Sequence, residues 1–432
     1  MTSNKLKWIL LSFWIVIMLA ACANSAPKPA DPSTVKSPIF FRVTWPEYSG
    51  RSTAIKEIVD VFNQTSEEPY EIVLIGGDED MAHIGDSLAD KDEPMLYALP
   101  YRLVKYYGEK GDLMDLSDVF SEESIHFYPK IWKLGIIENK LYGIPWIGHS
   151  ICLVYNADLL TKAGVDPKNI QSLETFVSAL ETVHNNTKAI GVGLVGADHN
   201  DVSWMVNQFV HAYGAELVDD SGKKVLLNTP EAENAIRFYR DTLGAYAQPS
   251  WREDTGVEVM NYFRAGQIAF EFQGIWGVTD IDKNHNPFEI GIIPLNTIGL
   301  KPEVGPILLG ASKNMPKDMK ETSDHFFQFM ISEEAQEMIF RGEYSPEHDT
   351  YYPFRVPMRK HIAEAMTSGE YSRYLPFLSG FDAPSIDVPT SKWQVIKEQL
   401  YQSGLHKVFS AKMTIKDFLN EVESSGNIIL NE

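Results

Sequence analysis

The stretch from Ile39 to Ile75, IFFRVTWPEYSGRSTAIKEIVDVFNQTSEEPYEIVLI, decides the fold class of this chain. It opens with an apolar strand at 39–43 and closes with a second one at 71–75. Between the strands, apolar residues recur at intervals of three and four positions, which is typical of an amphipathic helix: Ile55, Ile58, Val59 and Phe62. A strand, a helix and a strand in this order predict a βαβ unit with two parallel strands and a right-handed crossover.

The alternation of strand and helix continues downstream, so we expect an α/β fold throughout. An apolar run suited to a central strand lies at 151–155, and Thr229-Pro230 supplies the N-cap and the first-turn proline of a helix. Further strands are expected at 190–194 and 288–294, and helices at 173–183, 204–213, 229–243, 325–340 and 393–430. No internal repeat of about 20–50 residues is visible, which argues against a solenoid.

The composition is close to the average of globular proteins, with an acidic excess. The chain has 432 residues, of which 44% are hydrophobic, and its 59 acidic and 38 basic side chains give a net charge of -21. This length is too great for one ordinary core and predicts two domains. The acidic balance argues against a nucleic-acid partner, which would require basic patches. The two cysteines, Cys22 and Cys152, exclude a disulfide framework and a four-cysteine zinc site.

The first 22 residues indicate the compartment. Lys5 and Lys7 precede an apolar run at 8–19, which is too short to span a bilayer and predicts an export signal. The run ends in Leu19-Ala20-Ala21-Cys22, which resembles the lipobox of bacterial lipoproteins. The resemblance implies that a signal peptide at 1–21 is removed and that Cys22 is acylated, which anchors the protein outside the cytoplasmic membrane. An ordinary secretory signal with a chance cysteine is the alternative.

The segment after Cys22 is expected to be a tether. Residues 23–33, ANSAPKPADPS, are rich in Pro, Ala and Ser and contain no large apolar side chain, so they cannot contribute to a core. We therefore expect residues 22–37 to form an acylated, flexible leash. Cys152 would then be the only remaining thiol, and its apolar neighbours predict that it is buried.

Motifs for catalysis, metal binding and cofactor binding are incomplete. Residues 148–152, GHSIC, begin like the nucleophile elbow of a serine hydrolase but end in Cys instead of Gly. Asp78, Asp80 and Asp86 lack the glutamate that an EF-hand needs at its twelfth position. Residues 191–196 match G-x-G-x-x-G, but the glycines interrupt a strand and no helix opens at once, so we interpret them as a glycine-rich strand. We expect no metal, no cofactor and no catalytic residue, although paired carboxylates for glycoside hydrolysis would leave no sequence pattern.

Four stretches carry a family resemblance by their order and spacing. They are LYGIPW at 141–146 with VYNADLL at 154–160 and AGVDP at 163–167, YGAEL at 213–217 with DSGK at 220–223 and NTPEA at 228–232, FRAGQIAF at 263–270 with GIW at 274–276, and SEEAQ at 332–336. Together they resemble the extracellular solute-binding proteins related to maltose-binding protein, which are the receptors of sugar-importing ABC transporters. The resemblance extends from about residue 39 to the end of the chain.

This resemblance implies a two-lobe α/β fold of the type II periplasmic-binding-protein kind, with the ligand cleft between the lobes. It also implies a monomeric receptor, not an enzyme, that captures an oligosaccharide or glycoside by lobe closure and delivers it to the permease subunits of an ABC importer. A lipid-anchored glycoside-processing enzyme and a sugar-sensing subunit of a signalling system remain as alternatives. The N-terminal lobe is expected at 38–149 and 296–345, the C-terminal lobe at 150–295 and 346–432, and the crossings near 148–151, 294 and 344–354.

The expected site combines aromatic rings for the apolar faces of a sugar with carboxylate, amide and guanidinium groups for its hydroxyls. Trp276 matches the family's Gly-x-Trp segment, whose tryptophan commonly stacks on sugar. The loop 98–102 lacks the acidic residue that the family often places there. Core packing is the alternative role for the tryptophans. The residues expected to bind ligand are Trp45, Glu47, Tyr101, Arg102, Trp146, His149, Asp201, Trp204 and Trp276.

Overall fold

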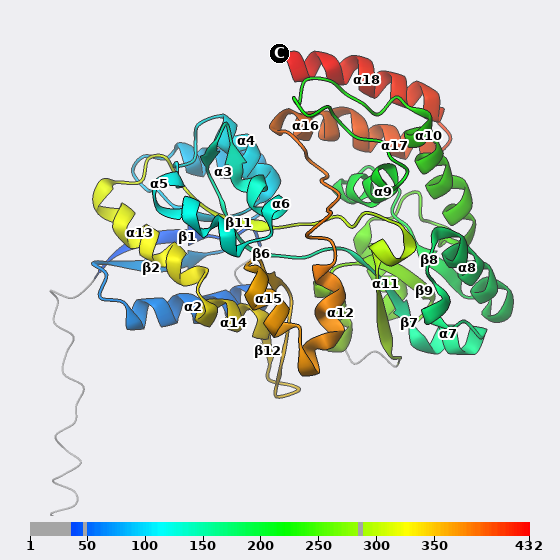
Figure 1. Cartoon of the computed structure of the whole chain (residues 1–432), viewed down its shortest axis with the longest axis horizontal. Helices are drawn as coiled ribbons and strands as arrows, with labels where there is room; N and C mark the ends of the chain where they lie inside the picture. The colour runs from blue at the N-terminus through cyan, green and yellow to red at the C-terminus, as the bar shows by residue number, and fades with distance from the viewer. Residues whose placement is uncertain (1–35, 46–49, 284–287) are drawn as a thin grey trace, which may run out of the picture.

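The chain forms two lobes, each built around its own β-sheet (Figure 1). The computed structural model describes residues 36–45, 50–283 and 288–432. The first sheet has six strands in the order β14-β6-β11-β3-β1-β2, and the second has four in the order β10-β7-β9-β8. The strands are β1 (Ser37–Arg42), β2 (Tyr70–Ile75), β3 (Leu96–Pro100), β6 (Ile144–Gly148), β11 (Ile307–Ala311) and β14 (Val356–Pro357), then β7 (Cys152–Asn156), β8 (Ile190–Gly193), β9 (Ile268–Gln273) and β10 (Ile290–Pro294).

The predicted βαβ unit is confirmed as β1, α2 (Gly50–Thr65) and β2. β1 pairs in parallel with β2 on one side and with β3 on the other. Ile55 and Ile58 of α2 are fully buried, because the apolar stripe of the helix faces the core. Parallel strands end at the same edge of a sheet, so the residues that follow β2 and β3 come close together there.

Helices cover both sheets. Figure 1 shows α2, α13 and α14 on one side of the first sheet and α3 and α4 on the other. The helices that belong with the first sheet are α3 (Met81–Ala89), α4 (Tyr101–Glu109), α5 (Ser117–Phe120), α6 (Pro129–Trp132), α13 (Lys317–Met330), α14 (Glu333–Arg341) and α15 (Lys360–Met366). Those that belong with the second sheet are α7 (Ala157–Ala163), α8 (Leu173–Thr187), α9 (Asn200–Ala212), α10 (Pro230–Arg237), α11 (Gly256–Arg264), α12 (Ile275–Lys283), α16 (Ser391–Ile396), α17 (Gln402–Phe409) and α18 (Ile415–Asn431).

Two of the expected helices are broken by internal caps. The helix predicted at 325–340 is divided between α13 and α14, because the Ser332 side chain accepts a hydrogen bond from the amide of Ala335 and starts a new helix. The helical region predicted at 393–430 is divided in the same way, since Thr414 accepts from the amide of Asp417 at the start of α18. The side chains of serine and threonine at these positions accept hydrogen bonds from amides of the first helical turn, which in a continuous helix would donate to backbone carbonyls instead.

The chain segments that cross between the lobes pair with one another. The Ile151 amide donates to the carbonyl of Glu303 at 2.9 Å, and the Gly305 amide donates to the carbonyl of His149 at 3.1 Å. On the other side, the Ser385 amide donates to the carbonyl of Pro302 at 2.8 Å. Three stretches of the chain, near residues 150, 304 and 385, therefore lie side by side at the junction of the lobes.

The last part of the chain contributes to both lobes. β14 pairs antiparallel with β6, so Val356 and Pro357 are part of the first sheet. The chain then forms α15, and Figure 1 shows that it later rises to α16, α17 and α18. Of these, α17 packs with α9, α18 packs with α10, and α16 packs with α18 and with α4 of the first lobe. The first sheet thus includes residues beyond 345, where the sequence placed the end of the N-terminal lobe, because β14 completes the sheet next to β6.

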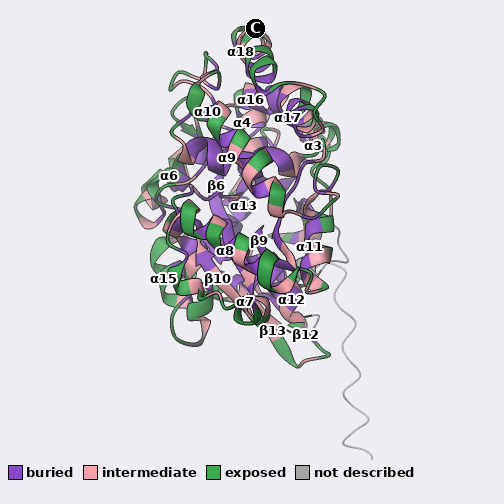
Figure 2. Ribbon diagram, turned by 90° about the vertical axis from the view of Figure 1, so that its right-hand side faces the viewer, coloured by how far each residue is buried: buried purple, intermediate pink, exposed green. Residues whose placement is uncertain are grey.

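An aromatic cluster holds the first sheet against its helices. The Phe41 ring lies 5.2 Å from that of Phe326 on α13 and 6.0 Å from that of Trp146 on β6, both in edge-to-face geometry. Phe62 of α2 contacts the same Phe326 ring at 5.2 Å. Edge-to-face contacts of this kind add about 0.5–1.5 kcal/mol each to the apolar burial. Figure 2 shows that the buried residues run through the interior of the molecule, β6 and β9 included.

The predictions for the first 35 residues, acylation of Cys22 among them, concern residues outside the described ranges. Within 36–45, 50–283 and 288–432, no helix combines the length and the apolar character needed to cross a bilayer. Cys152 is fully buried on β7, as predicted, and burial raises the pKa of its thiol.

The second sheet contains a buried carboxyl group at Glu271. This residue lies on β9 opposite Val154 and Gly193, and it is 0% exposed. Neither carboxyl oxygen has a hydrogen-bond partner among the described residues. Burial raises the pKa of Glu271 well above its usual value, so folding favours the protonated form of this carboxyl group.

We predict that Glu271→Gln becomes increasingly stabilising as the pH rises from 5 to 8. Above the ordinary carboxyl pKa the unfolded chain releases a proton that folded Glu271 retains, so the unfolding free energy of the wild type falls with pH through this group, by at most about 1.4 kcal/mol per pH unit. The glutamine side chain does not titrate, so the unfolding free energy of the variant does not change with pH through this position. Urea unfolding at several pH values measures the difference. The exposed Glu122→Gln should show no pH-dependent difference of this size, and equal slopes for the two variants would contradict the assignment.

Candidate functional site

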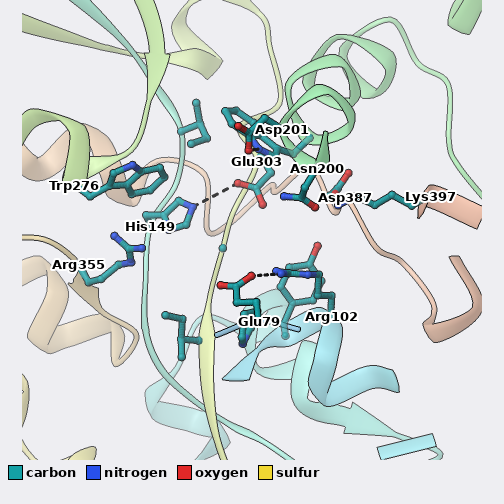
Figure 3. A pocket seen from close by; sticks show the side chains of 16 residues that line it. Glu79, Arg102, His149, Asn200, Asp201, Trp276, Glu303, Arg355, Asp387 and Lys397 are labelled. Atoms are coloured by element: carbon teal, nitrogen blue, oxygen red, sulfur yellow. Dashed lines mark hydrogen bonds and ion pairs between the residues drawn. The ribbon is translucent and has the colours of Figure 1, made fainter. Parts of the chain in front are cut away.

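A cleft lies where the two lobes meet (Figure 3). It encloses about 250 Å³ and receives side chains from both lobes and from the crossing segments. Its charged residues are Glu79, Arg102, Asp201, Glu303, Arg355, Asp387 and Lys397, and His149, Tyr101, Trp204, Trp276 and Asn200 add aromatic and amide groups. Polar and aromatic groups therefore converge on one enclosed space.

The first lobe contributes the residues that follow β2 and β3. Arg102, in the first turn of α4, forms an ion pair with Glu79, which follows β2 (Figure 3). Burial alone would lower the pKa of Arg102, but the Glu79 carboxylate raises it. Tyr101 is buried beside this pair, and its hydroxyl accepts a hydrogen bond from the amide of Val388 at 3.1 Å. The loop that lacks an acid in the sequence thus receives one from the segment that follows β2.

The second lobe contributes the first turn of α9. Asp201 accepts hydrogen bonds from the Gly256 amide at 2.9 Å and from the Trp204 indole at 3.3 Å. Burial would raise the pKa of Asp201, but these bonds and that of His199 outweigh the effect and lower it. The carboxylate is therefore ionised at neutral pH and fixes the orientation of the half-buried Trp204 ring. Asn200 precedes it in the same turn.

Trp276 lies at the start of α12, and its ring is held from three sides. A Cβ atom added to Gly274 would lie 1.8 Å from the indole, so this position requires glycine. The His149 ring meets the Trp276 ring edge-to-face at 4.4 Å. The Arg355 guanidinium lies 4.7 Å from the ring centroid, within the range of a cation–π interaction. Packing around Trp276 therefore presents a partly exposed ring to the cleft.

Asp387 and Lys397 form a buried ion pair at another wall of the cleft. Asp387 is 4% exposed and Lys397 is 1% exposed. Asn207 of α9 donates to Asp387 at 2.7 Å, and the Tyr401 hydroxyl donates to the Asn207 side chain at 2.7 Å. A buried ion pair is tolerated when such additional hydrogen bonds satisfy its members.

Glu303 lies on the segment between β10 and β11, facing the centre of the cleft (Figure 3). Its carboxyl oxygen is 3.5 Å from Nε2 of His149. Burial raises the pKa of Glu303 to about 8, and the neighbouring Asp387 carboxylate adds to the effect. At neutral pH this residue is therefore a neutral hydrogen-bonding group.

The cleft includes most of the residues expected from the sequence, but not all. Tyr101, Arg102, His149, Asp201, Trp204 and Trp276 line it. Trp146 lies in the core instead, because β6 buries it completely against Phe41. Trp45 is 8% exposed, packs in the core of the first lobe and does not line the cleft. Glu47 lies outside the described residues.

Several residues of the cleft were not expected from the sequence. Glu79 follows the parallel strand β2, and its position at the carboxyl edge of the sheet is the signal that could have indicated it. Asn200 directly precedes the predicted Asp201. The remaining ones, Glu303, Arg355, Asp387 and Lys397, come from segments far apart in the chain and carry no local pattern.

This arrangement suits reversible binding of a polar molecule. Trp276 and Trp204 offer ring faces, while paired carboxylates and cations around them offer hydrogen bonds in fixed positions. Among the residues that the structure describes, no group of three or more histidine, cysteine, aspartate or glutamate side chains could hold a metal ion. Of the glycine-rich stretch 191–196, residues 191–193 belong to β8 and 194–196 to no strand, and α9 begins only at Asn200. The strand interpretation therefore holds for the first half of the stretch.

Comparisons with known proteins agree with this architecture. The family model described as bacterial extracellular solute-binding protein matches residues 76–337. A probable ABC transporter-binding protein of Deinococcus radiodurans is 25% identical over 56% of this chain. The diacetylchitobiose binding protein DasA of Streptomyces coelicolor is 24% identical over 46% of this chain. The chain spans 59% and 46% of the length of these two relatives.

The fold is also that of solved structures. A solute-binding protein of an ABC transporter from Thermotoga lettingae, bound with α-D-tagatose, superposes with a TM-score of 0.76 at 17% identity. The match covers 91% of this chain and 100% of that protein, so both lobes are shared. Because the family model covers more than half of the chain and the whole fold agrees, the chain belongs to the family of bacterial extracellular solute-binding proteins.

Proposed function

We propose that this protein is the extracellular receptor of an ABC importer and that it captures a carbohydrate in the cleft between its lobes. The observation that carries the proposal is the environment of Trp276, a partly exposed ring with His149, Arg355 and Glu303 beside it. A sugar ring has apolar C–H faces that pack on an aromatic ring and hydroxyl edges that need hydrogen bonds. The protein is then a binding protein and not an enzyme.

The volume and the walls of the cleft support a small carbohydrate. A space of about 250 Å³ lies near the lower end of ordinary ligand pockets. The carboxylates that could accept hydroxyl hydrogen bonds, Glu79, Asp201 and Asp387, are already oriented by other side chains or backbone amides. Preorganised groups of this kind lose little conformational entropy when ligand binds.

Hydrogen bonds between the lobes support a closing motion. The Lys105 ammonium of α4 donates to the carbonyl of Pro389 at 2.7 Å, and the Tyr101 hydroxyl accepts from the amide of Val388. These contacts join a helix of the first lobe to the segment that leads to α16 of the second. Opening of the lobes about their crossing segments would have to break both bonds.

We propose that the two lobes divide near the expected boundaries, with 38–149 and 296–345 in one and 150–295 and the C-terminal helices in the other. The strand pairing of β14 and the packing of α15 against β14 and α14 favour an extension of the first lobe to Met366.

We also propose that the protein is held at the membrane by an acylated Cys22 and acts as a monomer. Two acyl chains would contribute about 0.8 kcal/mol for each buried CH₂ group, which is enough for stable anchoring. The tether from 22 to about 37 would keep the receptor near its permease and so raise the effective concentration there.

We predict that Trp276→Ala weakens saccharide binding at least tenfold, because it removes the ring against which the sugar face packs. Loss of about 1.4 kcal/mol of contact energy corresponds to this factor. Calorimetric titration with maltose, maltotriose, diacetylchitobiose and D-tagatose provides the measurement.

The control for this variant is Trp132→Phe, which changes a buried tryptophan of the first lobe outside the cleft and should leave affinity unchanged. Unimpaired binding by Trp276→Ala would refute the site. Release of shorter products from the added oligosaccharides would instead favour a glycoside-processing enzyme.

We predict that Cys22→Ser releases the protein from the membrane, because serine cannot be acylated through a thioether. Detergent phase partition of cells that express each form should place the wild type in the detergent phase and the variant in the aqueous phase. Cys152→Ser is the matched control and should remain in the detergent phase. If both variants partition like the wild type, the lipobox interpretation is wrong.

A further inference from the structure

Two crossing segments meet at the floor of the cleft and place a carboxyl group against an imidazole. His149 lies on the first crossing and Glu303 on the second, and backbone hydrogen bonds pair these segments on both sides of the two side chains. Nε2 of His149 is 3.5 Å from the Glu303 carboxyl. Gly305 makes this approach possible, because a Cβ atom there would lie 2.2 Å from the His149 ring.

The backbone of Glu303 is fixed by α9 of the second lobe and by the first crossing segment. Its amide donates to the Gln208 side chain of α9 at 3.2 Å, and its carbonyl accepts from the amide of Ile151 at 2.9 Å. The residue is 8% exposed, yet it lines the cleft. The carboxyl group therefore has little freedom to turn away from a ligand that reaches the floor.

Charged groups of both signs face Glu303. His149 lies on the first crossing, Arg102 on α4, and Arg355 on the segment before β14, while Asp387 and Lys397 form the buried pair of the second lobe. Arg102 is paired with Glu79, and Lys397 with Asp387, so both of these cations are partly neutralised by other carboxylates. Burial therefore dominates and, with Asp387, raises the pKa of Glu303 to about 8.

We propose that Glu303 is a ligand-contacting, specificity-determining residue that binds a neutral sugar hydroxyl as an uncharged carboxylic acid. The inference rests on the proposed carbohydrate-binding function. It adds that Glu303 contacts the ligand and that its carboxyl group is protonated when it does so. An uncharged carboxyl can donate one hydrogen bond and accept others, which matches a hydroxyl group in both roles. An ionised carboxylate could only accept, and its burial beside the Asp387 carboxylate would be costly.

Binding should therefore depend on pH through this residue. Affinity is expected to be constant well below pH 8 and to fall as the pH rises above 8, by up to tenfold per pH unit, because the ligand-binding form loses its proton. Glu303→Gln keeps a donor and an acceptor but cannot ionise. It should bind within about threefold of the wild type at pH 6 and show no decline between pH 6 and 9.5.

The binding test uses maltose, maltotriose, diacetylchitobiose and D-tagatose as probes for the wild type, Glu303→Gln and Glu303→Ala. Glu303→Ala should bind at least tenfold more weakly at pH 6, because the hydroxyl loses its partner. An alanine variant that binds like the wild type, or a glutamine variant that keeps the wild-type decline, would overturn the proposal. Thermal unfolding of each variant verifies that it is folded.

A second group titrates in the same pH range and needs its own control. Burial lowers the pKa of Lys105 to about 8, and this residue donates to Pro389 across the lobes. Lys105→Met should keep the part of the decline that is due to Glu303. Disappearance of the decline in Lys105→Met, with its persistence in Glu303→Gln, would assign the pH dependence to Lys105 instead.

A ligand-free measurement separates this proposal from the proposed function. Infrared difference spectra of the purified protein between pH 6 and 9.5 should show the carbonyl band of a protonated carboxyl that is lost near pH 8. The band should be absent from Glu303→Gln and present in Glu271→Gln. If no probe binds but the band is found, the carbohydrate function fails while the proton on Glu303 stands. If a probe binds and the band is missing, the uncharged-acid proposal fails while the receptor function stands.

Discussion

The pairing of the crossing segments is the constraint on which the rest of the molecule depends. The hydrogen bonds between 149–151 and 303–305 tie together two stretches that lead from one sheet to the other. These hydrogen bonds fix the position of the cleft, because the side chains of His149 and Glu303, which lie on the paired segments, both line it. The lobes can rotate about such a junction only as units, since each has its own sheet and helical layers.

The cleft is more highly charged than a neutral ligand would require, and its charges are mostly matched inside the protein. Arg102 is paired with Glu79, and Lys397 with Asp387, whereas Asp201 is held by backbone and side-chain donors. Each such pair costs desolvation energy that its own hydrogen bonds largely offset. These ion pairs therefore contribute fixed hydrogen-bonding directions more than net attraction to any ligand that enters the cleft.

The features that could be predicted from the sequence are those encoded by residues close together in the chain. The period of the apolar residues identified β1, α2 and β2, and the two-lobe α/β fold followed from short stretches spread over the chain. Trp276 and Asp201 were found because they lie at a motif or at a helix start. Trp146 was predicted wrongly to face the cleft, since a strand residue next to a crossing can face either side and periodicity does not decide which. Residues such as Glu303, Arg355 and Asp387 meet only through tertiary structure, and no spacing along the chain records that meeting.

One short segment has a consequence for how long a ligand stays bound. The Asp387 side chain is held by Asn207 and Lys397 of the second lobe, while the backbone of the next two residues bonds to Tyr101 and Lys105 of the first. Residues 387–389 thus bond to both lobes. If a ligand binds in the cleft as proposed, separation of the lobes would have to break these bonds before the ligand could leave, and the segment 387–389 would contribute to the activation barrier to dissociation. Affinity would then depend on the residues of the cleft, and residence time also on the segment 387–389.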